Sequence, residues 1–280
     1  KQVEHSEYQK CDDNPKGHIS TKIQVWNPPW KQRNVSFNYN PNVTIDDGSC
    51  IIPAVGKLVV GEFASGTWCG WCPRGTVVAN WMDHLYGDYF KSIEVHNGDP
   101  MTSNHDNGLS GVISGYPSVL IDRGNPINPD LPPVQGSIID SLFLQKIVIP
   151  PSAFLNNSSQ INGNTLVVSI DIDFQTSING SWSLACVLVE DSVTGSGSGW
   201  DQANYYSGGG AGALIDFDGT DWANLPDPTP ITYRHVSRSI QPDFSGQPLL
   251  NQSYNSGDTE TINFDFILDS SWDTTQMTII

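Results

Sequence analysis

Two cysteines separated by two residues are the part of this chain best suited to chemistry. Cys69 and Cys72 stand in the stretch Thr-Trp-Cys-Gly-Trp-Cys-Pro. A pair with this spacing can close a small disulfide ring or open to a dithiol, and its reactivity depends on how readily a thiol ionises. The pair is therefore a candidate site of thiol–disulfide exchange, with Cys69 as the exposed attacking thiolate and Cys72 as the shielded resolving thiol.

The segments on either side of this motif predict the elements that would support it. Residues 57–63 are short, apolar and rich in β-branched side chains, which indicates a buried strand. Residues 74–89 carry apolar side chains at helical spacing, and Pro73 suits the first helical turn, where a missing N–H costs nothing. The unpaired N–H groups at the start of such a helix favour a thiolate. A strand, Cys-x-x-Cys and a helix in this order indicate a thioredoxin-like redox site.

Further elements complete the same predicted domain. The sequence predicts strands at 91–96 and 118–122 and helices at 106–113 and 133–146. In thioredoxin-like folds a cis proline faces the Cys-x-x-Cys, and Pro117 stands where that proline is expected. Its role would be to hold the backbone of Tyr116 where a substrate chain can pair with it.

Four other side chains near the motif are candidates for the site. Glu62 ends the first predicted strand and is expected to exchange a proton with Cys72, with a pKa raised by burial. A partly solvated glutamate at the end of a strand is the alternative. Trp68, Trp71 and Tyr116 would form an apolar collar for an unfolded or extended protein substrate, or else ordinary packing around the motif.

Two simpler interpretations compete with redox cycling. The cysteines could be half of a zinc site, but zinc prefers four ligands, no second Cys-x-x-Cys exists, and the spacing of His96 and His105 is not that of a zinc site. The pair could also be a permanent structural disulfide, because in an oxidising compartment without a reducing partner it would stay closed. The zinc hypothesis is therefore weak, and the static disulfide stays open.

The charge of the chain narrows its partners. The formal net charge is -17 at pH 7, which disfavours nucleic acid and anionic membrane surfaces and favours divalent cations. The acidic excess is largest after residue 150, where Arg234 and Arg238 are the only arginines and lysine is absent. No apolar run approaches the ~20 residues that a transmembrane helix needs. We therefore expect a protein without a transmembrane segment.

The first part of the chain, residues 1–52, predicts an irregular module rich in proline and asparagine. A disulfide between Cys11 and Cys50 would close a loop of about forty residues, worth ~4 kcal/mol, and would require an oxidising compartment. No cofactor is required, but calcium is a candidate, with hard oxygen ligands from Asn40, Asn42, Asp46 and Asp47. The alternative is a turn held by Asx-type hydrogen bonds.

The pattern changes to a period of two after the predicted thioredoxin-like domain, which spans residues 53–149. Alternating apolar positions at 166–174, 182–188 and 262–268 predict an antiparallel β-sandwich over residues 150–280, with Cys186 as a small buried side chain. The fold class is therefore an α/β thioredoxin-like domain followed by an all-β sandwich. The chain ends on an apolar run like an interrupted strand, so we expect further sequence beyond residue 280.

Several stretches resemble one known family. Residues 62–75, 95–96, 99–101, 114–117, 187–206 and 234–238 are similar to the twenty-eight-kilodalton outer-membrane-protein family of bacteria. This resemblance implies an extracytoplasmic protein (secreted, periplasmic or associated with the outer membrane) with a thioredoxin-like domain followed by a β-sandwich. It implies no established reaction.

Two functions of different classes follow from the sequence. The first is thiol–disulfide exchange with protein clients through the Cys-x-x-Cys, which would make the protein an oxidoreductase. The second is a secreted or cell-surface binding or adhesion protein, which would use the acidic sandwich for surface ligands and keep the thioredoxin-like domain as a scaffold with a static disulfide.

Overall fold

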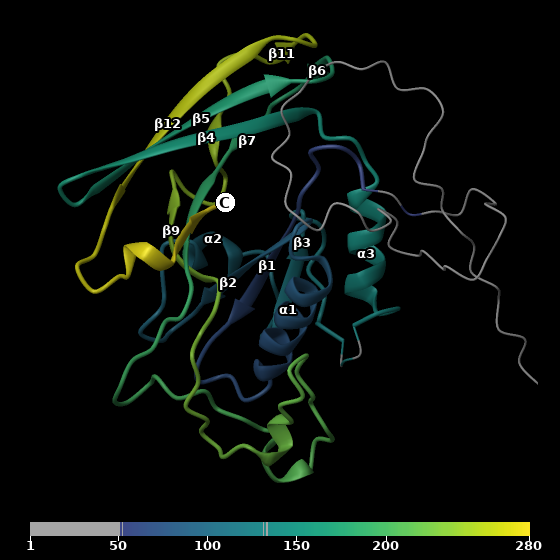
Figure 1. Cartoon of the computed structure of the whole chain (residues 1–280), viewed down its shortest axis with the longest axis vertical. Helices are drawn as coiled ribbons and strands as arrows, with labels where there is room; N and C mark the ends of the chain where they lie inside the picture. The colour runs from purple at the N-terminus through teal and green to yellow at the C-terminus, as the bar shows by residue number, and fades with distance from the viewer. Residues whose placement is uncertain (1–50, 52, 131, 133) are drawn as a thin grey trace, which may run out of the picture.

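The computed structural model of the chain describes residues 51, 53–130, 132 and 134–280, which form mostly sheet with few helices (Figure 1). The predicted irregular module lies outside the described residues. So do the proposed Cys11–Cys50 disulfide and the candidate calcium ligands Asn40, Asn42, Asp46 and Asp47.

The elements of the first half follow the predicted order with small shifts. They are β1 (Val59–Ser65), α1 (Pro73–Tyr86), β2 (Phe90–His96), α2 (Asp106–Leu109), β3 (Ser118–Ile121) and α3 (Ile138–Ile147). Helix α3 begins later than expected because Ser137 caps it, its side chain accepting a hydrogen bond from the backbone N–H of Asp140. Helix α2 is a single turn, shorter than the prediction.

The main sheet has six strands, and it takes them from both predicted domains. Its order is β13-β8-β9-β2-β1-β3, in which the added strands are β8 (Cys186–Glu190), β9 (Val236–Gln241) and β13 (Met277–Ile279). Strand β2 pairs with β1 and with β9 in parallel, whereas β3, β8 and β13 run antiparallel to their neighbours. The predicted boundary near residue 150 therefore does not separate two sheets.

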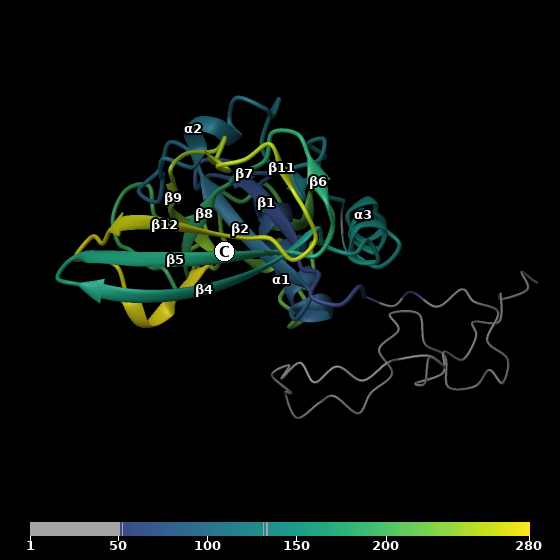
Figure 2. The ribbon, with the colours of Figure 1, turned by 90° about the horizontal axis from the view of Figure 1, so that it is seen from above.

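A second sheet carries the alternating pattern seen in the sequence. Strands β4 (Ala153–Asn162), β5 (Thr165–Phe174) and β12 (Thr259–Ile267) pair antiparallel and run side by side in the order β12-β5-β4 (Figure 2). Every second residue of β5 and β12 is buried, and this face packs on Cys186 and Leu188 of β8. The predicted strands at 166–174 and 262–268 are thus confirmed, while their packing partner is the main sheet.

Several short elements lie between the longer strands. Two small antiparallel pairs join β6 (Ile178–Asn179) to β11 (Ser253–Tyr254) and β7 (Ser183–Leu184) to β10 (Gln247–Pro248). Single 3-10 turns lie at Ser207–Gly209, Trp222–Asn224 and Thr274–Gln276. Across the described ranges, no helix combines the length and apolar character that crossing a membrane requires.

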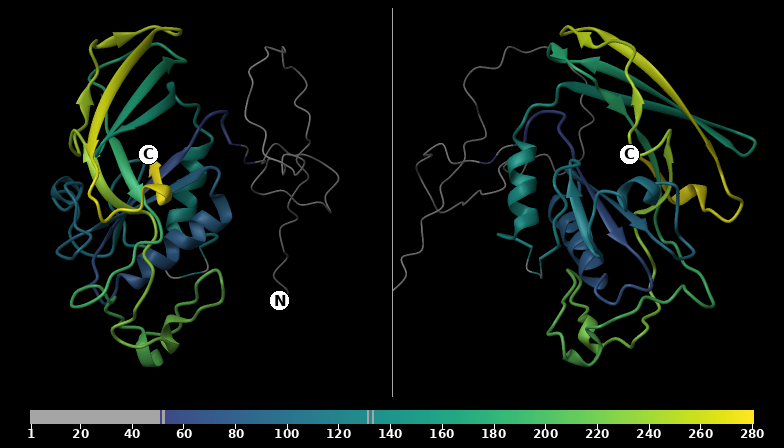
Figure 3. Two further views of the ribbon diagram at one scale, coloured as in Figure 1. Left: turned by 60° about the vertical axis from the view of Figure 1, so that its left-hand side comes forward. Right: turned by 180° about the vertical axis from the view of Figure 1, so that it is seen from behind.

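Side-chain alternation along β1 places two sets of residues on opposite faces of the main sheet. Val59 and Phe63 pack in the core beneath α1 and α3, which lie on one side of the sheet (Figure 3). Ala64 faces the other way, into a core that includes Val187 of β8. Because side chains alternate along a strand, Glu62 points to the same side as Ala64, away from α1.

Candidate functional site

The Cys-x-x-Cys motif forms a disulfide at the start of α1. Cys72 occupies the N-cap position, Pro73 follows as the first helical residue, and the Cα atoms of Cys69 and Cys72 are 5.3 Å apart. Cys72 is fully buried and Cys69 is only 5 % exposed. The expectation of an exposed Cys69 is therefore wrong for this disulfide form, because a segment from the C-terminal half of the chain covers the motif.

The predicted cis bond before Pro117 is confirmed, and it lies beside the motif. The Tyr116–Pro117 peptide is cis. A Cβ atom placed on Gly75, in the first turn of α1, would be 3.3 Å from Cβ of Pro117. The ring of Tyr116 packs edge-on against Trp68, with centroids 5.4 Å apart. Pro117 and Tyr116 thus border the disulfide loop from the β3 side.

The three aromatic residues expected to form a collar divide into two groups. Trp68 contacts Tyr116, and its indole N–H donates to the carbonyl of Asn97 at 2.6 Å. Trp71 instead packs edge-on against Tyr205 and Tyr206, with centroids 5.5 and 5.6 Å away. Trp68 is 52 % exposed and Trp71 44 %, so both retain free surface. Tyr205 and Tyr206 were not predicted as part of the site, because no local pattern links them to the motif.

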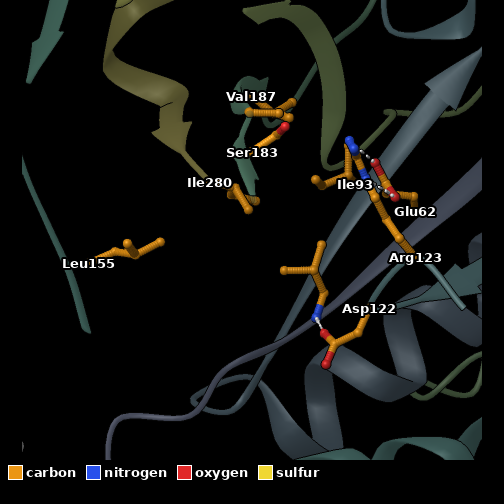
Figure 4. Close-up of a pocket in the computed structure, with 10 residues that line it drawn as sticks. Glu62, Ile93, Asp122, Arg123, Leu155, Ser183, Val187 and Ile280 are labelled. Atoms are coloured by element: carbon orange, nitrogen blue, oxygen red, sulfur yellow. Dashed lines mark hydrogen bonds and ion pairs between the residues drawn. The ribbon is translucent and has the colours of Figure 1, made fainter. Parts of the chain in front are cut away.

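Glu62 belongs to a different cluster from the one expected. Its carboxylate accepts hydrogen bonds from Nε2 of His105 at 2.8 Å and from Nε and Nη2 of Arg123 at 3.2 Å. Together with Arg123 it lines a cavity of about 310 Å³, whose walls include Ile93 and Val187 (Figure 4). The partners of Glu62 are therefore His105 and Arg123, on the face of the sheet opposite α1.

The expected raised pKa of Glu62 is wrong. Burial alone would raise it, but the hydrogen bond from His105 and the charge of Arg123 outweigh burial and lower the pKa below its ordinary value. His105 itself is buried, and its Nδ1 lies 2.9 Å from the hydroxyl of Ser237. If that hydroxyl donates to Nδ1, the Nε2–H of His105 is available to donate to Glu62.

Asp99 and His96 hold the loop that precedes the disulfide, and we call these two residues the clamp. One carboxylate oxygen of Asp99 accepts from the backbone N–H of Thr67 at 2.9 Å and lies 2.7 Å from Nδ1 of His96. The other accepts from the backbone N–H of Met101 at 2.8 Å. Nε2 of His96 lies 3.6 Å from the Glu94 carboxylate. In the sequence, the only local sign of this clamp is the His-x-x-Asp spacing at the end of a predicted strand, which by itself does not define a partner.

The clamp should make stability depend on pH. Burial lowers the pKa of His96, but the hydrogen bond to Asp99 and the nearby Glu94 carboxylate raise it overall, to about 9. A pKa above the unfolded value of about 6.5 gives stability that is full below pH ~6.5 and is lost as the pH rises through ~9.

We therefore expect the free energy of unfolding to fall by on the order of 3 kcal/mol between pH 6.5 and 9.5 because of this group. His96→Gln should flatten this part of the profile in denaturant titrations. His84→Gln, on the exposed surface of α1, is the matched control and should keep the slope. A variant profile as steep as that of the wild type would show that His96 is not the group responsible.

Comparisons with known proteins bear on the fold alone. No protein-family model and no curated protein sequence matches the chain. A solved structure of HBP35 of Porphyromonas gingivalis is similar, with a TM-score of 0.56 and 15 % identity over 81 % of this chain and 69 % of that chain. A solved structure of a protein from Agrobacterium tumefaciens is only distantly similar, with a TM-score of 0.38 and 16 % identity over 75 % of this chain and 79 % of that chain. The mostly-sheet fold and the Cys69–Cys72 disulfide are compatible with a thioredoxin-like protein.

Proposed function

We propose that this chain is an extracytoplasmic thioredoxin-like protein that exchanges thiols and disulfides with protein clients through Cys69 and Cys72. The observation that carries the proposal is the position of the disulfide, at the start of α1 and beside Tyr116–Pro117. There the positive end of the α1 helix dipole can stabilise a thiolate as the disulfide opens.

The chemistry follows from the disulfide form. A client thiolate attacks Sγ of Cys69, the bond between the two sulfurs breaks, and Cys72 leaves as a thiolate. A second client thiolate then attacks the client sulfur of the mixed disulfide and releases the Cys69 thiolate. The client loses two electrons and gains a disulfide, while the protein gains the two electrons as a dithiol. The same steps in reverse would reduce a client disulfide.

The cellular setting and the family are part of the proposal. The resemblance to the twenty-eight-kilodalton outer-membrane-protein family supports an extracytoplasmic location (secreted, periplasmic or bound at the outer membrane). Two of the stretches that carry it include parts of strands in the main sheet. The stretch 187–206 begins in β8, the stretch 234–238 ends in β9, and both strands extend the sheet of β1 and β2. A disulfide persists most readily in an oxidising compartment, which agrees with this location.

A binding protein with a static disulfide is the second candidate. It is favoured by one observation: both sulfurs belong to buried residues, with Cys69 only 5 % exposed. Disulfides that are only structural have reduction potentials below about -300 mV, and reactive ones lie above that value. The potential of the Cys69–Cys72 pair therefore separates the two candidates.

The experiment is a redox titration of the whole chain, followed by alkylation and mass spectrometry at each cysteine. We expect a potential above about -300 mV for Cys69–Cys72 and a mixed disulfide with client protein in the Cys72→Ser variant but not in Cys69→Ser. Cys186 is an internal control, since burial raises the pKa of its thiol to about 12 and should protect it from alkylation. A lower potential with no trapped client would favour the binding protein.

A further inference from the structure

One segment from the C-terminal half of the chain pairs with the Cys-x-x-Cys loop, and we call residues 202–206 the strap. The backbone N–H of Ala203 donates to the carbonyl of Thr67 at 2.7 Å. The backbone N–H of Tyr205 donates to the carbonyl of Gly70 at 2.9 Å. The strap thus lies along one side of the disulfide loop as an added strand would.

The opposite edge of the strap is held just as firmly. The backbone N–H of Gln202 donates to the carbonyl of Thr229, and that of Asn204 donates to the Asp227 carboxylate, both at 2.8 Å. The buried side-chain amide of Asn204 also donates to the carbonyl of Trp222 at 3.0 Å. Successive N–H groups therefore bond alternately to the loop and to residues 227–229, so the strap is hydrogen-bonded along both of its edges.

The Gln202 side chain ties the strap to the loop. Its buried amide nitrogen lies within hydrogen-bond distance of the carbonyls of Gly66, Thr67 and Cys69, at 3.2, 3.4 and 3.0 Å. Each of these carbonyls also accepts a backbone N–H, from Cys69, Ala203 and Cys72 respectively, so the Gln202 amide uses their second acceptor positions and links the strap to the loop at three points.

An aromatic ring closes this side of the disulfide. The ring of Tyr205 lies directly over Gly70, where any Cβ atom would overlap it, and packs edge-on against Trp71. Tyr205 is itself 57 % exposed, so it presents its outer surface to solvent. A folded partner that approaches Cys69 from this side would meet Tyr205 and Trp71 before it met sulfur.

The side formed by Tyr116 is different. Within the part of the chain that the structure describes, neither the backbone N–H nor the carbonyl of Tyr116 takes part in a hydrogen bond. An extended chain could pair with these two groups, as in strand addition to a sheet edge, and contact Trp68 beside them. The disulfide is therefore covered by residues 202–206 of its own chain on one side and bordered by the unpaired backbone groups of Tyr116 on the other.

We propose that the strap determines which clients the site accepts: it admits cysteines in extended chain segments and excludes cysteines on the surface of folded proteins. The proposal rests on the proposed thiol–disulfide exchange and names its substrate class. A client segment would lie along Tyr116, with its cysteine sulfur reaching Cys69 from the side that Tyr116 borders.

The test compares how fast three dithiols reduce Cys69–Cys72. The probes are dithiothreitol, an unfolded peptide with two cysteines, and reduced thioredoxin as a folded dithiol protein. In Tyr205→Ala we expect reduced thioredoxin to reduce the disulfide at least about tenfold faster than in the wild type, and in Gln202→Ala/Tyr205→Ala faster still. The reduction rates with dithiothreitol and with the unfolded peptide should change less than about threefold. Because Tyr205 is largely exposed, the single variant should fold.

Phe217→Ala is the matched control, since Phe217 is an exposed aromatic of the same region that stacks on His84 instead of the motif. It should leave all three rates unchanged. Equal changes with all three probes, or none in the strap variants, would overturn the role of the strap while leaving thiol exchange intact. A wild-type disulfide that dithiothreitol does not reduce at all would instead contradict the proposed function.

Discussion

Arg123→Leu is expected to destabilise the protein by about 2–3 kcal/mol at pH 7. The Arg123 guanidinium holds the carboxylate of Glu62 with two hydrogen bonds of 3.2 Å, and Glu62 is buried. Removing one partner of a buried ion pair leaves an uncompensated charge, which lowers the free energy of unfolding by about 3–5 kcal/mol. The expected loss is smaller here because the Arg123 side chain is 36 % exposed, so solvent already screens the pair. Urea unfolding at pH 7 would measure the change.

The cost should shrink as the pH falls. In the wild type the pKa of Glu62 is lowered, so its contribution to stability is present above about pH 4.5 and is lost only at more acidic pH. Without Arg123, burial should dominate and raise the pKa of Glu62 above the unfolded value. The folded variant would then take up a proton first, and its deficit relative to the wild type should narrow between pH 7 and about 4.5.

A double variant separates charge from packing. Arg123→Leu also removes the hydrogen bond from Nη1 to the carbonyl of Phe244 and the contact of the guanidinium with the Phe244 ring, at 4.1 Å from its centroid. Glu62→Gln/Arg123→Leu loses the same contacts but has no buried charge, and the amide oxygen of the introduced glutamine can still accept from His105. We expect it to recover about 1–2 kcal/mol at pH 7. A double variant as unstable as Arg123→Leu would show that packing on Phe244 decides the result.

The local elements were predictable because their signals lie within short stretches. Alternation at 166–174 predicted β5, since a strand with one buried face has a period of two wherever it packs. The apolar spacing after Pro73 predicted α1 in the same way. What β8 pairs with was not predictable. All residues of Cys186–Glu190 are buried. A short apolar run of this kind indicates a strand in the middle of a sheet but does not indicate which strands lie next to it.

The site was predictable only where its residues are close in sequence or follow a known order. Cys69, Cys72 and Pro117 could be placed from the motif and the order of elements. The hydrogen bonds from Gln202 to Cys69 and from Arg123 to Glu62 join residues 133 and 61 positions apart. A glutamine or an arginine in the sequence does not indicate which distant residue it will bind. The partners of Glu62 were not predictable for the same reason, because His105 and Arg123 lie 43 and 61 residues away in the sequence.

Asp99→Asn is expected to destabilise the protein by about 3 kcal/mol at pH 6. The carboxylate of Asp99 accepts from Thr67 and Met101 with different oxygens and faces the buried imidazole of His96. An asparagine has only one acceptor oxygen, so its NH₂ group must face one of these N–H donors, and the positive charge on His96 loses a buried partner. The Thr67 amide should also exchange its hydrogen faster, because the loop before Cys69 loses its anchor.

The dependence on pH distinguishes this clamp from a simple packing defect. The wild-type advantage due to His96 is complete below pH ~6.5 and gone above its folded pKa of about 9, so the gap between wild type and Asp99→Asn should narrow to about 1 kcal/mol near pH 9.5. Asp106→Asn is the matched control, because its buried carboxylate bonds to Asn97 and Tyr116 and touches neither Thr67 nor His96. Its cost should stay constant over this range. If the loss of unfolding free energy in Asp99→Asn were also constant over this pH range, Asp99 would act only through its hydrogen bonds to backbone N–H groups. The buried His96 imidazolium would then not help to hold the loop that carries the disulfide.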